Sequence, residues 1–472
     1  QHGVNNSAKA GYYKEWDSIY AALVQRDVVL VKGNWLETFA ANGKGRGLPR
    51  RQEVPWEAVW KVEDLMADVR DFNRTTPQVL SISYSWLTRP HPDPEGYHLQ
   101  KFAPLLKHFA RQKRIGTENL AVFIDWCSVP QRPMNQQDLA IFQRGLKFCD
   151  IWYAHSLTEV WMLTDTPQGI TPYEDRGWTK FERALASLSK PPEQVLDLGK
   201  VPTAWKNWQQ LEKECQAKRT PPQSPEAFEN DLKTKVFTVA DDRETVAAKY
   251  KDTFIRALAS EEQLWFAGLG WGDKEAIELA RILPSCMALK TLELGGNELS
   301  ATGASALMEV LVICPSLEFL CLDKNQLPEK AVQNFRAAWE AARKPLDGLD
   351  LGDQQVRSSI VPKDIKSNKA TTAEQLNQLL ARQAAFEARI ESAVTKVSDS
   401  LVEVAENIGP AGHGPRGRHY APCGHAASRR SGSPESIAAN LRARSSKASY
   451  ARRPRGSTVR ACRVLPHTSL WC

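Results

Sequence analysis

The chain has 472 residues, of which 42% are hydrophobic and 25% are charged, a composition typical of globular domains. It contains no run of about 18 apolar residues, so we expect no membrane span and two or three domains. The net charge of +7 is uneven, because residues 409–472 carry twelve Lys and Arg against one Glu and leave the rest slightly acidic. The nine cysteines form no CxxC pair, and the first residues show no apolar signal core. We therefore expect a cytoplasmic protein with reduced cysteines.

Residues 1–76 are predicted to form an N-terminal helical extension. Apolar spacing favours helices at 17–25 and 55–72, and the run "DVVLVKG" favours a short strand. The loop "NGKGRGLPRR" contains glycines and a lysine, but it lacks the GxxxxGK[ST] spacing of a phosphate-binding loop. We therefore assign it no nucleotide role.

Residues 77–240 alternate between predicted strands and amphipathic helices. The predicted strands are 78–86, 119–126 and 157–164, with two further candidates at 193–199 and 234–239, and the helices are 96–113, 135–149 and 176–186. This order predicts an α/β fold with a parallel sheet and flanking helices. Pockets in such sheets lie beyond the carboxyl ends of the strands, where Tyr84, Trp86 and Asp125 are expected.

The helix predicted from "RGWTKFERALA" (176–186) carries a carboxylate in an unusual position. Trp178, Phe181 and Leu185 recur at three- and four-residue spacing and form an apolar stripe. Glu182 lies at the edge of this stripe rather than on the opposite, wet face. Glu182 is either an ordinary residue at the boundary between the buried and exposed faces of the helix, or the catalytic acid of a pocket.

Three blocks in this region, "SISYSWL", "VFIDWCSVPQ" and "RGWTKFE", resemble the heterokaryon-incompatibility (HET) domain in composition and order. That family is regarded as related to Toll/interleukin-1 receptor (TIR) domains, and "WTKFE" is similar to the TIR block "WCxxE". The resemblance covers residues 77–240 and implies a TIR-like, flavodoxin-like sheet. Because this block supplies the catalytic glutamate of NAD-cleaving TIR domains, it implies a catalytic Glu182. The chain departs from the family patterns at Leu87, Cys127 and Thr179.

The chemistry of NAD cleavage suits the residues expected at this pocket. Breaking the bond between nicotinamide and ribose builds positive charge on the sugar, which a carboxylate such as Glu182 stabilises. Aromatic faces stack on a flat base. The candidate NAD-binding residues are Tyr84, Trp86, Asp125, Trp126 and Trp178. The alternatives are that Asp125 caps a turn and that the tryptophans only pack. We expect no metal and no tightly bound cofactor, with NAD as a candidate substrate.

Residues 241–355 contain a repeat of 28 residues. "LKTLELGGNEL" starts at Leu289 and "LEFLCLDKNQL" at Leu317, with degenerate copies near Leu264 and Leu349. The pattern resembles leucine-rich repeats of the ribonuclease-inhibitor type, in which leucines fill the core. We expect the repeat asparagines to hydrogen-bond backbone groups at the strand-to-loop turns, and we expect the arc to bind proteins.

Two segments follow the repeats. Apolar residues recur every seven positions in 370–408, which predicts an amphipathic helix, either a coiled coil or a helix packed on the repeats. Residues 409–472 are rich in Gly, Ser, Pro and Arg, which predicts a disordered basic tail able to contact nucleic acid through charge.

Together these features predict an intracellular signalling protein of innate defence or self-recognition. A TIR/HET-like effector domain, cleaving NAD after self-association, would be coupled to a protein-binding repeat arc. The alternative is a non-catalytic scaffold whose α/β domain only self-associates, and a third hypothesis is nucleotide binding without turnover.

Overall fold

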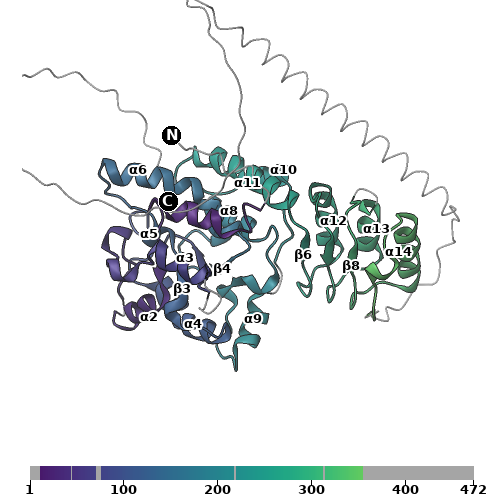
Figure 1. The fold of residues 1–472 in the computed structure, drawn as a ribbon, viewed down its shortest axis with the longest axis horizontal. Coiled ribbons are helices and arrows are strands. Elements are labelled where there is room, and N and C mark those ends of the chain that lie inside the picture. Colours follow the sequence, from purple (N-terminus) through teal and green to yellow (C-terminus); the bar gives the residue numbers. More distant parts are fainter. Residues whose placement is uncertain (1–10, 44, 71–75, 217–218, 312–313, 355–472) are drawn as a thin grey trace, which may run out of the picture. The chain divides into compact units, whose positions relative to one another are not determined.

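The computed structural model describes residues 11–43, 45–70, 76–216, 219–311 and 314–354 (Figure 1). The predicted helix at 370–408 and the predicted basic tail at 409–472 lie outside these residues. None of the helices in the described ranges combines the length and the apolar content that a membrane crossing requires. The six described cysteines are all buried, and none of them forms a disulfide.

The first part of the chain is built on a five-stranded sheet with the order β1–β3–β2–β4–β5. Its strands are β1 (Val31–Lys32), β2 (Gln78–Tyr84), β3 (Leu120–Phe123), β4 (Thr158–Leu163) and β5 (Val195–Asp197). All neighbouring pairs are parallel except β1 and β3. The central strands β2, β3 and β4 are buried on both faces apart from Gln78, as their continuous apolar runs require. The predicted α/β class with a parallel sheet is therefore confirmed.

Helices cover both faces of this sheet. One face, with Leu80 and Ile82 of β2, packs on α2 (Gly33–Ala41), α4 (Tyr97–Gln112) and α9 (Trp208–Gln216). The opposite face, with Val79 of β2 and Val160 of β4, packs on a second set of helices. That set contains α1 (Trp16–Leu23), α3 (Val62–Arg70), α6 (Gln136–Gly145), α7 (Cys149–Ala154), α8 (Gly177–Ala186), α10 (Pro225–Leu232) and α11 (Asp242–Ala259).

The structure corrects three predicted elements. The segment 234–239 is not a strand, because its backbone pairs through Val236 with the entry of α8 instead of with a sheet edge. The helix predicted over 135–149 ends at Gly145 and is followed by a 3-10 turn and α7. The strand predicted over 119–126 ends at Phe123, and Asp125 begins the short helix α5 (Asp125–Ser128).

Two segments outside residues 77–240 are part of the α/β packing. Strand β1 pairs with β3 and forms one edge of the sheet, and α2 packs on α4. Helix α11 contacts α7, α8 and α10, so this packing extends to Ala259.

The second part of the chain is a four-stranded parallel sheet in sequence order. Its strands are β6 (Gln263–Trp265), β7 (Thr291–Glu293), β8 (Phe319–Cys321) and β9 (Leu349–Asp350). Helices α12 (Asp273–Ile282), α13 (Ala301–Val310) and α14 (Glu329–Ala341) connect the strands and pack on one another in turn. Leu264, Leu292 and Leu320 stand side by side in register and are at most 1% exposed.

Buried amide side chains link each turn of this sheet to the next. The Asn297 Oδ1 accepts from the backbone N–H groups of Leu269 and Trp271, at 3.0 and 3.1 Å, and its Nδ2 donates to two backbone carbonyls. Asn325 repeats this arrangement one turn later, and Gln354 takes the same role at the last turn. The predicted backbone hydrogen bonds of the repeat asparagines are therefore confirmed.

Candidate functional site

A small cavity of ≈ 40 Å³ lies beyond the carboxyl ends of β2 and β3. Five of the six residues predicted from the sequence line it: Tyr84, Trp86, Asp125, Trp178 and Glu182. The remaining lining residues are Arg176 and Thr179 of the α8 entry and Val236 and Thr238 of the segment before α11. Segments far apart in the sequence thus meet at one edge of the sheet.

Asp125 is held by three hydrogen-bond donors. The Tyr84 hydroxyl donates to its Oδ1 at 2.5 Å, the Trp86 indole N–H to its Oδ2 at 3.1 Å, and the Trp126 backbone N–H to its Oδ1 at 2.7 Å. The carboxyl is only 6% exposed. Burial raises the pKa of Asp125, while the three donors oppose that rise because they stabilise the charged form. Asp125 thus braces its own turn and also faces the cavity.

Glu182 is equally buried, at 6% exposure, but its partners are hydroxyl groups. The Ser83 hydroxyl donates to its Oε2 at 2.5 Å, and the Tyr153 hydroxyl is also hydrogen-bonded to this carboxyl. Ser83 in turn lies 2.5 Å from the Tyr173 hydroxyl. Burial first, and then the charge of Asp125, raises the pKa of Glu182 well above its usual range.

The two carboxyl groups therefore have different protonation preferences. Asp125 is bound by indole and backbone N–H groups that can only donate, and these favour a carboxylate. Glu182 faces hydroxyls, which can accept as well as donate, so a protonated Glu182 keeps its hydrogen bonds. When two neighbouring acids are buried together, the shared environment favours one neutral acid and one charged carboxylate. The hydrogen-bond partners of the two groups thus favour the neutral acid at Glu182 and the carboxylate at Asp125.

Arg176 adds a cation to the cavity. Its guanidinium donates to the backbone carbonyls of Trp86, at 2.7 Å, and Thr171, at 3.3 Å, and within the described ranges it forms no ion pair with a carboxylate. Burial lowers the pKa of Arg176. A half-buried guanidinium bonded only to carbonyls favours an additional anionic partner, such as a phosphate group.

The segment between α10 and α11 covers the cavity. The Val236 N–H donates to the Asp175 carbonyl at 2.7 Å, and its carbonyl accepts from the Gly177 N–H at 3.0 Å. The Phe237 ring packs so closely on Gly177 that any side chain there would collide with it. The cavity volume of ≈ 40 Å³ is too small for a nicotinamide ring, and Val236 and Thr238 of this segment form part of its lining. Displacement of this segment would enlarge the cavity.

Trp126 is the predicted site residue that does not line the cavity. Because Asp125 starts a helical turn, the Trp126 ring turns away and packs edge-on against Trp86, with ring centroids 5.3 Å apart. Its indole N–H donates to the Leu48 carbonyl at 3.0 Å, and its other side meets His91. Trp126 therefore contacts Trp86, which lines this cavity, and Leu48 and His91, which line a larger one.

Sequence reasoning missed four residues of the site: Ser83, Tyr153, Tyr173 and Arg176. Ser83 and Arg176 stand inside the blocks "SISYSWL" and "RGWTKFE", so a search for polar residues in those blocks would have found them. The two tyrosines lie in unrelated stretches, and only the fold brings them to Glu182.

In comparisons with known proteins, no protein-family model matches the chain, and no curated protein sequence matches it. Within the described ranges no three His, Cys, Asp or Glu side chains are grouped so that they could hold a metal ion. The chemistry open to the cavity is that of a neutral acid, a carboxylate, a guanidinium and aromatic faces.

Proposed function

We propose that the α/β part cleaves the N-glycosidic bond of a nucleotide, with NAD as the substrate. The observation that carries the proposal is the Asp125–Glu182 pair, two buried carboxyl groups with different hydrogen-bond partners that line one cavity. In this cleavage the C–N bond breaks with its electron pair going to nicotinamide, which leaves as a neutral molecule and needs no proton, and water adds to the sugar and releases a proton. A carboxylate stabilises the cationic sugar, and a neutral acid hydrogen-bonds a sugar hydroxyl. Asp125 takes the first role, Glu182 the second, and Arg176 binds a phosphate.

The strand order supports a TIR-like fold for this part. The four parallel strands stand in the sheet in the order β3–β2–β4–β5. Numbered along the chain from β2, this order is 2-1-3-4, which matches the first four strands of a flavodoxin-like sheet. In that fold ligands bind where the strand order reverses, next to the first strand. Tyr84 and Trp86 follow this strand, so the cavity lies at the position that a TIR-like fold favours.

The test is the release of nicotinamide from NAD by the full chain at high protein concentration. Glu182→Gln and Asp125→Asn keep most hydrogen bonds but remove the proton or the charge, and each is expected to lower the rate about 10²-fold or more. The matched control is Glu174→Gln, an acid near the same helix whose carboxylate pairs with Arg183 at the surface. Full activity in both site variants, with circular dichroism unchanged, would disprove the assignment.

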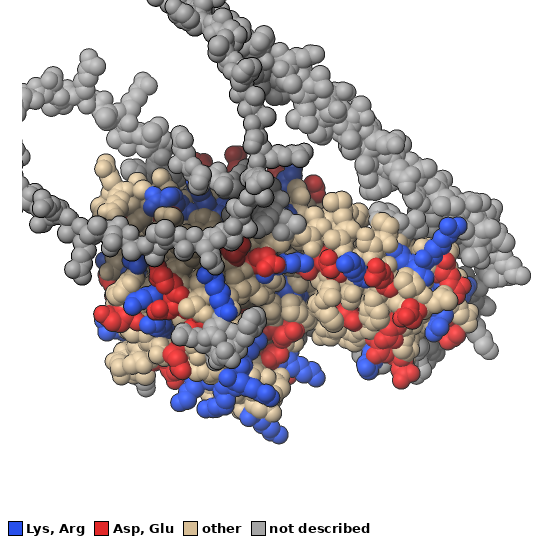
Figure 2. Space-filling view, viewed as in Figure 1, with Lys and Arg blue, Asp and Glu red and all other residues tan. Residues whose placement is uncertain are grey.

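We propose that the second part is a leucine-rich-repeat arc that binds a protein partner. Its parallel strands repeat every 28 residues in register, which supports this fold. The open sheet face presents Trp265 of β6, which is 41% exposed, and half-buried Phe319, two strands away on β8. Acidic and basic side chains are interspersed on the visible face of this part of the chain (Figure 2). Exposed aromatics among mixed charges are typical of protein interfaces. Coupled to the α/β part, such an arc suits signalling in innate defence or self-recognition.

The alternative, a non-catalytic scaffold that only self-associates, is favoured by one observation: the ≈ 40 Å³ cavity has no room for a nicotinamide ring. The two proposals differ in one result. The scaffold releases no nicotinamide even when the protein is forced to cluster, although sedimentation detects its self-association. The enzyme releases nicotinamide, and release increases when Val236→Gly loosens the covering segment.

A further inference from the structure

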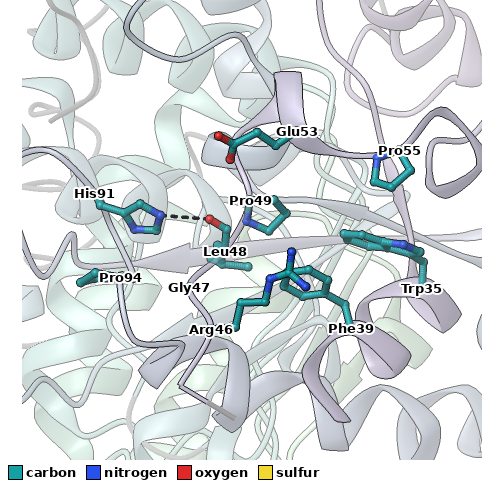
Figure 3. Close-up of a pocket in the computed structure, with 10 residues that line it drawn as sticks. All are labelled: Trp35, Phe39, Arg46, Gly47, Leu48, Pro49, Glu53, Pro55, His91 and Pro94. Atoms are coloured by element: carbon teal, nitrogen blue, oxygen red, sulfur yellow. Dashed lines mark hydrogen bonds between the residues drawn. The ribbon is translucent and has the colours of Figure 1, made fainter. Parts of the chain in front are cut away.

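A second and much larger cavity, of ≈ 510 Å³, is lined by Leu48 and His91, both of which contact Trp126, together with eight others (Figure 3). Its size falls in the range of sites for small organic ligands, about 300–1,000 Å³. It is lined by α2, the loop that follows α2, and the loop between β2 and α4. None of its lining residues belongs to the Asp125–Glu182 cavity.

Two aromatic rings of α2 and one cation of the loop that follows α2 form one side of this cavity. Trp35 and Phe39 are stacked, with centroids 4.8 Å apart and planes inclined by 24°, and both are half-buried. The Arg46 guanidinium lies 4.6 Å from the centroid of the Phe39 ring (Figure 3). Arg46 is exposed, and within the described ranges it forms no ion pair. The cavity thus offers a flat apolar surface beside an uncompensated positive charge.

The backbone that carries Arg46 is fixed in place. A side chain at Gly47 would collide with the carbonyl oxygens of Asp93 and Pro94, and one at Gly96 would collide with the Arg46 carbonyl. The Leu48 N–H also donates to the Asp93 carbonyl at 3.3 Å. The glycine at position 47 of "NGKGRG" therefore allows two loops to touch, and it positions Arg46 before any ligand arrives.

The other polar groups of the cavity already have partners. The two ring nitrogens of His91 are hydrogen-bonded to the Leu48 carbonyl and the Asp93 N–H, each at 3.0 Å. Arg50 neutralises Glu53 with side-chain hydrogen bonds of 3.0 and 2.6 Å. The remaining walls include Pro49, Pro55 and Pro94, which are apolar. Recognition of a charged ligand here therefore depends on Arg46.

We propose that this cavity binds a planar aromatic anion of the purine-nucleotide class, with its ring on the Trp35–Phe39 pair and its phosphate on Arg46. Stacking of a base on aromatic side chains is favourable for every base, and a guanidinium matches phosphate geometry. A proline-rich peptide also binds aromatic grooves, but it brings no anion for Arg46. The proposal does not depend on catalysis at Glu182.

The test is calorimetric titration of the full chain with three probes: AMP, adenosine and inorganic phosphate. We expect one saturable AMP site, about tenfold weaker binding of adenosine because it lacks the charge, and no measurable binding of phosphate alone. Arg46→Gln is expected to weaken AMP about tenfold and leave adenosine unchanged. Trp35→Leu is expected to weaken both about tenfold. Arg111→Gln, an exposed arginine at the far end of α4, is the matched control and should bind as wild type does.

Three results would overturn the proposal: no AMP binding, equal binding of AMP and adenosine with no effect of Arg46→Gln, or tight binding of a proline-rich peptide that AMP does not displace. Glu182→Gln separates this site from the other cavity. It should abolish nicotinamide release and leave AMP binding unchanged, so the two proposals fail independently. Weaker AMP binding in Glu182→Gln would place the nucleotide in the smaller cavity instead.

Discussion

The two parts of the chain bury polar side chains in opposite ways. In the repeat part, Asn297 and Asn325 are neutral amides, at 4% and 0% exposure, and their hydrogen bonds go to backbone groups. In the α/β part, Glu182 and Asp125 are ionisable, and most of their partners are other side chains. One arrangement joins neighbouring turns, whereas the other gathers reactive groups at a sheet edge.

This difference distinguishes polar groups that stabilise the fold from those that we propose to be functional. An amide that satisfies backbone donors and acceptors removes unpaired groups from the interior, so it stabilises the fold. A buried carboxyl group costs solvation free energy and shifts its own pKa, and such groups cluster at functional sites. The contrast predicts that the amides matter for stability and the carboxyl groups for activity.

The largest effect on stability is expected from the repeat leucines. Leu292→Ala and Leu320→Ala each remove a side chain that is 1% exposed, so each should lower the free energy of unfolding by about 2–5 kcal/mol. Lys290→Ala is the control, because the ion pair of Lys290 with Glu262 is exposed and should contribute less than about 1 kcal/mol. Urea denaturation that ranked these variants in the reverse order would mean that the repeat register is wrong.

The next largest effect on stability is expected from the buried asparagine side chains of the repeat part. Asn325→Ala leaves the Leu299 N–H and the Leu294 and Leu322 carbonyls without their side-chain partner, so it should cost at least about 2 kcal/mol. Asn34→Ala, at an exposed position of α2, should change stability by less than about 0.5 kcal/mol. Thermal melts compare the two, and equal melting temperatures would refute a structural role for the amides.

The smallest effect on stability is expected at Glu182's hydroxyl partner. Ser83→Ala removes the hydrogen bonds of Ser83 with Glu182 and Tyr173 and should cost about 1–2 kcal/mol, while nicotinamide release falls. Ser81→Ala is the matched control on the same face of β2, because Ser81 donates to the Trp152 carbonyl and not to the acid. Equal activity of the two variants would show that the Ser83 hydrogen bond has no catalytic role.

Much of the α/β part was predictable because continuous apolar runs mark its central strands. The carboxyl ends of parallel strands meet at one edge of the sheet, and this rule predicted that Tyr84 and Asp125 lie at one site, as they do. Tyr153, a hydroxyl partner of Glu182, and Tyr173, which is hydrogen-bonded to Ser83, were not predictable, since only the fold brings these tyrosines to the site. The segment 234–239 has a strand-like local pattern, but packing of Phe237 on Gly177 holds it across the cavity instead.

The central claim, that Glu182 is buried at a cost in stability, is tested most directly by the pH dependence of unfolding. Because the pKa of Glu182 is raised in the folded state above its usual 4.5, the folded chain holds a proton there that the unfolded chain releases. The contribution of Glu182 to stability is therefore complete below about pH 4.5 and is lost as the pH rises, by up to about 1.4 kcal/mol per pH unit.

Glutamine at position 182 binds no proton, so the Glu182→Gln variant lacks this dependence of the free energy of unfolding on pH. The measurement is the free energy of unfolding of wild type and Glu182→Gln by urea denaturation, at several pH values between about 5 and 8. We predict that the difference changes steadily in favour of Glu182→Gln as the pH rises, because titrations common to both proteins cancel. A constant difference, with Glu182→Gln less stable by about as much as Asn325→Ala, would contradict the account and make Glu182 a structural residue.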